Sequence, residues 1–490
     1  MYAKSVLAVV LMSWWALCGR SHAQDAKPAQ PARQRPNIVF ILADDLGWTD
    51  LGVQGSKYYE SPNIDRLAAG GMRFTDGYSC GPNCQPTRAA LLSGQYEPRT
   101  GIYTVGNINR FDWETQKLRP VDNAKGLPLE KVTMAQALKD AGYATAMFGK
   151  WHLGNGAEYH PSQRGFEDAI ESAGKHFDFD TDPKVEYPKG QYLADFLTDR
   201  AVDFIRKNKD KPFFLYLPHY GVHSPYQAKP EYIQKFKQKE AAGGHKDPTY
   251  AAMIYSVDES VGRIVALLDE LKLAENTLVI FSSDNGGVGG YHREGITNAN
   301  DRTDNAPLRG GKGMLYEGGV RVPFIFRWKD KIKPGTVAHE PIISVDMYPT
   351  LLEVAAASKR PDYVLDGKSL VPLLMSDGSA TLPREALYWH FPGYLGAGEG
   401  QWRTKPGGAI RVGDMKLIEF FEDNRLELYN LKDDLSQKHD LASSQADLAK
   451  SMHEKLLAWR TDLGAKMPTP NDPKQASNQP RKRRKGSEDE

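Results

Sequence analysis

Runs of consecutive apolar residues alternate with helical patterns along the first two thirds of the chain. The apolar runs occupy residues 36–43, 143–148, 212–217 and 277–281, and segments with apolar residues at helical spacing occupy 134–141, 192–207 and 250–271. Short continuous apolar runs are typical of buried parallel strands. Strands that alternate with helices indicate an α/β sheet with helices on both faces. We therefore predict a large mixed or mostly parallel sheet sandwiched by helices.

The pattern changes near residue 383. Aromatic-rich segments with strand-like character occupy residues 386–391, 408–412, 415–421 and 426–431, and a helical pattern follows at 446–463. This order predicts a smaller C-terminal α+β domain with an antiparallel sheet. We place the catalytic domain at 36–372 and the C-terminal domain at 373–466.

The two ends of the chain have the composition of segments outside the fold. Lys4, an apolar run at 6–17 and the small residues Ser21 and Ala23 predict a signal peptide over 1–23, followed by a linker over 24–35. The run is too short to span a bilayer comfortably, although an uncleaved anchor is the alternative. We expect export to the periplasm or the medium, with no stable membrane span after cleavage. Residues 467–490 contain a basic stretch at 481–485 and predict a disordered tail.

Charge and cysteine content narrow the function. The 490 residues include 63 basic and 62 acidic side chains, so the basic excess of a nucleic-acid-binding protein is missing, and we expect no nucleic-acid partner. Removal of the signal peptide leaves two cysteines, Cys80 and Cys84. In an exported chain they form a disulfide, or one of them is reserved for chemistry.

Polar side chains gather where the predicted strands end. In open α/β sheets, ligand sites lie outside the carboxyl ends of the strands. We therefore expect one site at this edge of the sheet. The residues that follow the four runs are Asp44, Asp45, Lys150, His152, His223, Asp284 and Asn285.

Residues 84–94 carry the most specific motif. The segment begins Cys84-Gln85-Pro86-Thr87-Arg88 and ends in Ser-Gly, which resembles the sulfatase signature. Thr87 stands where that family usually has serine, and it keeps the hydroxyl. Segments 149–154, 222–225 and 310–313 match further sulfatase motifs in order, so the resemblance covers about residues 36–465. On these motifs the chain resembles the sulfatase family of the alkaline-phosphatase-like superfamily.

The resemblance implies an arylsulfatase-like sulfuric ester hydrolase that acts on a sulfated saccharide. A formylglycine-generating enzyme would oxidise Cys84 to Cα-formylglycine, whose hydrate attacks sulfur with one hydroxyl and expels sulfate with the other. Arg88 would hold the hydrate and the sulfate charge. The resemblance assigns neutralisation of the sulfate charge to Lys150 and Lys312. It assigns the role of general base to His152 and that of general acid to His223.

The candidate metal ligands are all oxygen donors at two strand ends. Asp44, Asp45, Asp284 and Asn285 offer the side-chain oxygens that suit a hard cation. By resemblance they bind one Ca²⁺ rather than Mg²⁺, and residue 84, as formylglycine, completes the shell.

Two residues of the C-terminal domain are candidate sugar contacts. His390 and Arg411 do not belong naturally in an apolar core, whereas the aromatic residues around them are explained by core packing.

Two other functions stay open at this point. One is a phosphodiesterase or phosphonate hydrolase of the same superfamily. The other is a catalytically silent protein that binds sulfated glycans. A silent protein would be expected to lack at least one of the five residues Cys84, Arg88, His152, His223 and Lys312, and none is missing.

Overall fold

The computed structural model describes residues 35–398 and 400–472. Contacts divide the chain after Gln34, and the unit described here begins at Arg35. The predicted signal peptide, all of the predicted linker except Arg35, and residues 473–490 lie outside the described residues, so those expectations stay predictions. Within the described ranges, no helix has both the length and the apolar character needed to cross a membrane.

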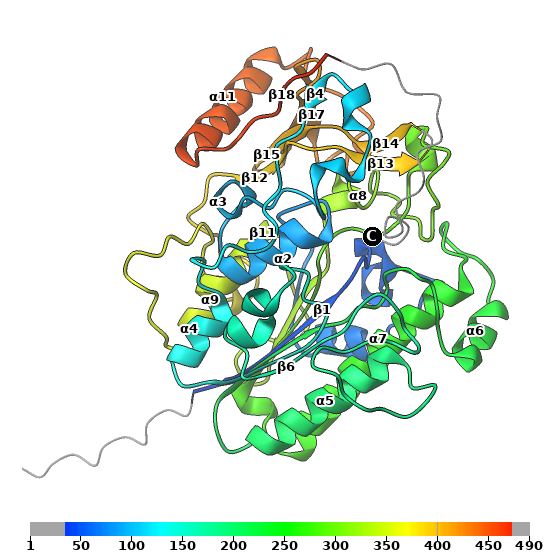
Figure 1. Ribbon diagram of the computed structural model, residues 1–490, viewed down its shortest axis with the longest axis vertical. Coiled ribbons are helices and arrows are strands. Elements are labelled where there is room, and N and C mark those ends of the chain that lie inside the picture. The colour runs from blue at the N-terminus through cyan, green and yellow to red at the C-terminus, as the bar shows by residue number, and fades with distance from the viewer. Residues whose placement is uncertain (1–34, 399, 473–490) are drawn as a thin grey trace, which may run out of the picture. The chain divides into compact units, whose positions relative to one another are not determined.

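An eight-stranded sheet forms the centre of the molecule, in the order β10-β2-β9-β8-β1-β7-β5-β6 (Figure 1). The predicted apolar runs form its middle strands. The adjacent strands β8, β1, β7 and β5 all run parallel to one another, whereas β9 runs antiparallel to both β8 and β2. The sheet is therefore mixed and mostly parallel, as predicted. The bounds are β1 Asn37–Ala43, β2 Met72–Phe74, β5 Ala144–Gly149, β6 Asp168–Glu171, β7 Phe213–Pro218, β8 Thr277–Ser283, β9 Phe324–Trp328 and β10 Thr336–Ala338.

The pairing of β1 explains why its sequence is apolar throughout. Ile41 lies in register with Leu217 of β7 and with Phe281 of β8, and all seven residues of β1 are buried. Successive side chains point to opposite faces, so Phe40 belongs to one core cluster and Ile41 to the other. A strand covered on both faces has no solvent-facing side, which is why no alternation with polar residues appears.

Helices cover both faces of this sheet. α1 Pro62–Ala69, α5 Leu193–Asn208, α6 Pro230–Lys237 and α7 Pro248–Glu270 pack on the face of Ile41. α2 Cys84–Ser93, α4 Met134–Asp140, α9 Met347–Val354 and α10 Val371–Leu374 pack on the face of Phe40. In Figure 1, α2, α4 and α9 lie on one side of the sheet and α5 and α7 on the other. α9 is preceded directly by a short 3-10 turn at Ser344–Asp346.

A four-stranded antiparallel sheet lies at the top of Figure 1, in the order β12-β15-β16-β17. Its strands are β12 Leu387–Phe391, β15 Gly407–Val412, β16 Met415–Phe420 and β17 Arg425–Asn430, and α11 Ala446–Asp462 packs against it. The predicted smaller α+β element is therefore present. Its core also includes Tyr78, Cys80 and Ala90, and Trp389 Nε1 donates to the carbonyl of Ser79 at 2.8 Å. The division at residue 372 stays a prediction.

The start of the predicted tail is paired. Thr469–Pro470 form β18, which is antiparallel to β4 Leu118–Arg119. The disordered tail predicted from residue 467 therefore does not describe these residues, since the pairing with β4 fixes them.

Candidate active site

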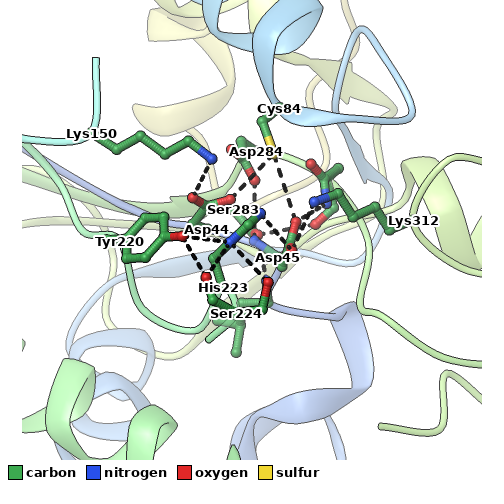
Figure 2. A network of polar contacts seen from close by, with 12 residues as sticks. Asp44, Asp45, Cys84, Lys150, Tyr220, His223, Ser224, Ser283, Asp284 and Lys312 are labelled. Carbon is green, nitrogen blue, oxygen red and sulfur yellow. Dashed lines mark hydrogen bonds and ion pairs between the residues drawn. The ribbon is translucent and has the colours of Figure 1, made fainter. Parts of the chain in front are cut away.

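Four parallel strands end at one edge of the large sheet, and the predicted polar residues lie there. Asp44 and Asp45 follow β1, Lys150 follows β5, and Asp284 and Asn285 follow β8. His223 lies five residues after β7. These side chains are buried and in contact, as Figure 2 shows for most of them. The structure thus brings together the groups that sequence reasoning placed at strand ends.

Gly149 allows the ends of β5 and β7 to meet. Its φ is +130°, and a Cβ there would lie 2.0 Å from the carbonyl oxygen of Pro218. Any other residue would push the strands apart at this point. The close approach lets the Lys150 amide donate to that same carbonyl at 2.8 Å, which holds Lys150 at the site.

Cys84 is the first residue of α2 and faces two carboxylates. Its Sγ lies 3.3 Å from Asp44 Oδ1 and 3.8 Å from Asp45 Oδ1. Both Cys80 and Cys84 are free thiols, so the structure contradicts the alternative of a disulfide between them. Burial, then the charges of Asp284 and Asp44, raise the pKa of the Cys84 thiol well above its usual value. The unmodified side chain is therefore a protonated and weak nucleophile.

Three buried cations surround the carboxylates. Arg88 Nε donates to Asp284 Oδ2 at 2.8 Å, and another of its nitrogens donates to the carbonyl of Lys150. Lys150 Nζ lies 2.8 Å from Asp44 Oδ2, and Lys312 Nζ lies 2.9 Å from Asp45 Oδ2. In Figure 2 the two lysines reach the carboxylates from opposite sides, below Cys84. Each cation is paired with one carboxylate, so a bound divalent cation would leave this group with net positive charge beside Cys84.

The carboxylates do not all respond alike to this environment. Burial opposes ionisation of Asp44, yet the neighbouring cations, led by Lys150, hold the pKa of Asp44 well below its usual value. Burial and the charge of Asp44 instead raise the pKa of Asp284 to about 6, despite the nearby Arg88. A carboxyl that is crowded by another negative charge would be stabilised by an additional cation.

His223 is oriented by its Nδ1 side. Nδ1 lies 2.7 Å from the carbonyl of Ser224 and 3.0 Å from the hydroxyl of Tyr220. A carbonyl can only accept, so Nδ1 carries the proton of the neutral ring and Nε2 keeps its lone pair, 3.7 Å from Asp45 Oδ2. Burial, then the charges of Lys150 and Lys312, lower the pKa of His223 to about 3. His152 is partly exposed and has a left-handed φ of 63°, and its predicted role toward residue 84 stays a prediction.

The residues present fit a divalent cation. Among the described residues, ligand atoms of Asp44, Asp45, Cys84 and His223 all lie within 4.8 Å of one another. Asn285 donates from Nδ2 to Asp45 at 2.8 Å, while its buried Oδ1 has no hydrogen-bond partner among the described residues. An orphaned buried oxygen beside carboxylates is a suitable donor for a hard cation. His223 was not among the predicted ligands, and Asp284 and Asn285 lie beside the group.

The two candidate sugar contacts of the C-terminal sheet already have protein partners. His390 is buried and its Nε2 lies 2.9 Å from the carbonyl of Lys466. Arg411 is buried and forms an ion pair with Asp76 at 2.6 Å. These contacts account for both side chains within the fold, so their role in substrate binding stays a prediction that the geometry does not favour.

Sequence reasoning missed the residues that support the site from behind. His176 Nε2 lies 2.8 Å from the carbonyl of His223, and the Tyr250 hydroxyl lies 2.7 Å from Asp50 Oδ2 and 3.1 Å from the carbonyl of Asp45. Tyr250 lies inside α7 and His176 lies in a loop, so no motif marks either of them. Only the three-dimensional packing identifies them.

Comparison with known proteins agrees with this geometry. The sulfatase family model matches residues 36–357, and the model of the N-sulphoglucosamine sulphohydrolase C-terminal region matches 311–462. A protein of Formosa agariphila named sulfatase is 36% identical, over 87% of this chain and 89% of its own. The N-acetylgalactosamine-6-sulfatase of Canis lupus familiaris is 33% identical, over 77% of this chain and 72% of its own.

A solved structure gives the same result for the fold. The crystal structure of Ps i-CgsB superposes with a TM-score of 0.74 at 30% identity, and it covers 88% of this chain and 93% of its own. The family match covers both the strand ends and the Cys84 helix, where the buried carboxylates, lysines and arginine meet. The chain therefore belongs to the sulfatase family and is a sulfuric ester hydrolase.

Proposed function

We propose that this sulfatase removes sulfate from a sulfated saccharide, with Cα-formylglycine at residue 84 and one Ca²⁺. The observation that carries the proposal is the position of Cys84, which begins α2 and points at Asp44 and Asp45. Burial raises the pKa of its thiol, so the unmodified side chain is a weak nucleophile, which supports conversion to formylglycine.

The names of relatives support a saccharide substrate. One relative is an N-acetylgalactosamine-6-sulfatase, and Ps i-CgsB has also been solved in complex with k-i-k-neocarrahexaose. A third relative, from Mus musculus, is named steryl-sulfatase and is also 33% identical. The saccharide assignment therefore needs its own test, with a steroid sulfate included.

The charged residues have roles that follow from their contacts. When oxidised to formylglycine, residue 84 supplies a hydrated aldehyde, which attacks sulfur and later releases sulfate. Lys150 and Lys312 lie on either side of the carboxylates and would neutralise the sulfate oxygens. Arg88, held by Asp284, would orient the group at residue 84. His223 would donate a proton to the leaving oxygen, a role that requires the ring to be protonated on Nε2 first. The ring is neutral in the free site, and the negative charge of a bound sulfate ester would favour that proton. His152 would serve as the base for sulfate release.

Asp44, Asp45, Asp284 and Asn285 would hold the cation, together with residue 84. A bound Ca²⁺ supplies charge that stabilises the anionic ester at the nucleophile. The orphaned Asn285 oxygen and the raised pKa of Asp284 both favour a cation here. Export to the periplasm or the medium rests on residues 1–23 alone.

Turnover of defined substrates tests the proposal, measured as sulfate release from the sulfate esters and as alcohol release from the phosphorus esters. The panel contains sulfated mono- and oligosaccharides, a steroid sulfate, a phosphodiester and a phosphonate monoester, and the enzyme is coproduced with a formylglycine-generating enzyme. We expect turnover of at least one sulfated saccharide, and none with Cys84→Ala. Turnover confined to the steroid sulfate or to the phosphorus esters would contradict the saccharide assignment.

A further inference from the structure

Arg302 lies beside the active site through a stack of aromatic rings. Its guanidinium carbon is 4.3 Å from the centroid of the Tyr226 ring, and Tyr226 comes three residues after His223. The Tyr226 ring lies 6.2 Å from that of Tyr250, whose hydroxyl lies 3.1 Å from the carbonyl of Asp45. Two aromatic residues thus connect Arg302 to the main chain of Asp45.

Arg403 approaches the site from the C-terminal part of the chain. It belongs to β14 Gln401–Thr404, which pairs with β13 Leu395–Gly398, and its guanidinium carbon lies 4.8 Å from the centroid of Tyr291. Tyr291 donates its hydroxyl to the carbonyl of Lys312 at 2.8 Å. A Cβ built on Gly313 would lie 3.7 Å from the Cβ of Arg403. Arg403 is therefore next to the lysine that pairs with Asp45.

Asp247 compensates part of the positive charge of Arg302, whereas Arg403 has no carboxylate partner among the described residues. Arg302 has one ion pair, to Asp247 at 3.4 Å, and its side chain is 32% exposed in a cleft of about 870 Å³. Arg403 has no ion pair or hydrogen bond to any of the described residues. The buried Nε of each arginine has no hydrogen-bond partner among the described residues. The terminal nitrogens of Arg403 and Nη2 of Arg302 are not among these buried atoms, so they remain available to an external acceptor.

The chemistry of these positions selects an anion. A guanidinium supported on an aromatic ring presents a planar fork of donors, which matches sulfate and carboxylate oxygens in pairs. Tyr226 lies three residues after His223, the proposed general acid, and Arg403 lies beside Lys312, which is assigned to the sulfate oxygens. Both arginines are therefore next to groups of the proposed catalytic site. An anion bound there would belong to the saccharide that departs, not to the sulfate being removed.

We propose that Arg302, on the Tyr226 side of the site, and Arg403, on the Tyr291 side, each provide a position for an anionic substituent beyond the scissile sulfate, so that the preferred substrate is a saccharide with more than one anionic group. This inference rests on the proposed function, since it names the substrate class of the same site. The second group is a sulfate or a carboxylate, which share the oxygen geometry that the arginines recognise.

Matched saccharides test the inference in the active enzyme. The series has one scissile sulfate on a common oligosaccharide and differs in a second group, which is a hydroxyl, a sulfate or a uronic carboxylate. We expect kcat/KM to be at least about 10-fold higher with one of the two anions than with the hydroxyl, the scale of a charged hydrogen bond. The anion that gives the gain identifies the source.

Arginine variants show whether these residues cause the preference. Arg302→Ala and Arg403→Ala should each lower kcat/KM about 10-fold on the doubly anionic saccharide and less than about 2-fold on the singly sulfated one. Arg302→Lys and Arg403→Lys should recover part of the loss. The control is Arg425→Ala, because Arg425 also lies over an aromatic ring, Phe420, but on β17. Its kcat/KM should match that of the unaltered enzyme on both saccharides.

Binding to the Cys84→Ala variant gives a second readout that does not depend on residue 84. Isothermal titration with the doubly anionic saccharide should show Kd rising about 10-fold when either arginine is also replaced. Equal losses on singly and doubly anionic saccharides, or no loss with either, would overturn the inference while turnover of the singly sulfated saccharide still upheld the proposed function. Absence of turnover with every saccharide would overturn both.

Discussion

At the scale of single residues, two histidines are expected to act at different steps. His223 is buried beside Asp45, with its Nδ1 held by the Ser224 carbonyl, whereas His152 is partly exposed. Loss of the base for sulfate release should leave the first transfer intact, so His152→Ala should give a stoichiometric burst of alcohol product. His223→Ala should lack the burst and lose about 10²–10⁴-fold with a sugar leaving group.

The same two variants also distinguish a catalytic from a structural role. Rapid-mixing measurements of alcohol release should show a much smaller loss for His223→Ala with an activated aryl sulfate, since a phenolate needs little protonation. Equal losses on both leaving groups would mean that His223 binds sulfate or supports the fold. A burst in His223→Ala but none in His152→Ala would mean that the two assignments are reversed.

Metal binding should depend on pH through Asp284. Its pKa is raised to about 6 by burial and by the charge of Asp44, so the free protein holds a proton there below that pH. A cation needs the ionised carboxylate, so below about pH 6 its binding must displace this proton. We therefore expect the Ca²⁺-induced rise in Tm to be large at pH 7 and to shrink toward pH 5.

A matched variant tests this pH effect. Asp284→Asn should remove most of the Ca²⁺-induced rise in Tm at all pH values, because the carboxylate is gone. A Ca²⁺ effect that is equally large at pH 5 and pH 7 in the unaltered protein would contradict the role of Asp284 as a ligand.

Most residues of the site could be predicted from the sequence because they lie within short, recognisable motifs. Cys84 and Arg88 lie in one helix turn, and Lys150 and His223 lie in short matching segments. His390 and Arg411 show the limit of this reasoning. A buried histidine or arginine is expected to be functional only if the fold offers it no partner, and Lys466 and Asp76 are brought to them by packing.

At the scale of elements, the hydroxyl of Thr87 closes the loop before α2. It accepts from the Gly81 amide at 3.0 Å and donates to the Gly81 carbonyl at 3.0 Å. Thr87→Ser keeps both contacts and should retain activity. Thr87→Val keeps the shape but leaves the buried Gly81 amide unsatisfied, while the Gly81 carbonyl keeps its bond from Ser79 Oγ at 2.8 Å. The change should cost about 1–3 kcal/mol and lower kcat by shifting Cys84.

Urea unfolding and initial rates measure these two effects on the same preparations. Unchanged stability and turnover in Thr87→Val would show that the loop is held by other contacts. The residue that replaces the usual serine is thus explained by its hydroxyl, as the sequence suggested.

Strands were predictable from the sequence where every residue of the strand is buried, and less predictable elsewhere. β1, β7 and β8 are apolar throughout because each is covered on both faces. β9 was missed although its first three residues are buried, because its five residues end in partly exposed Arg327 and Trp328. Its antiparallel direction depends on the connection from Arg321, which no local pattern encodes.

At the scale of the whole molecule, a buried charge network joins the C-terminal sheet to the rest. Glu317 lies 2.7 Å from Lys416 of β16 and 2.7 Å from Arg321, and both Glu317 and Lys416 are fully buried. Burial opposes ionisation of Glu317, but Lys416 and the two arginines hold its pKa far below the usual value. Lys416→Met should therefore destabilise the protein by about 3–5 kcal/mol, since it removes one partner of a buried charge.

The destabilisation should depend on pH with a definite sign. A depressed carboxyl pKa contributes stability above its unfolded value, near 4.5, and that contribution is lost as the pH falls. The difference between Lys416→Met and the unaltered protein should thus be largest at pH 7 and shrink below pH 4. Lys405→Met is the control, because the Lys405 side chain is 46% exposed and pairs with Glu422 near the surface. Equal unfolding free energies for the two variants would contradict the importance of the network.

The predicted boundary at residue 372 can be tested at the same scale. The core of the C-terminal sheet includes Tyr78, Cys80 and Ala90, so a chain that ends at residue 372 would expose their apolar surface. We expect that truncated chain to be insoluble or to lack a cooperative unfolding transition. Cooperative unfolding of the fragment would support two independent domains. The sequence indicates where the pattern of strands and helices changes, but not how much surface the two parts of the chain share.

The central claim is that residue 84 acts as formylglycine. Peptide mass spectrometry of active enzyme tests it most directly, because conversion of cysteine to the aldehyde lowers the mass of the peptide by about 18 Da. We predict that the modified fraction of the peptide containing residue 84 rises in proportion to sulfatase activity across preparations. Full activity in protein whose Cys84 is entirely an unmodified thiol would contradict the account.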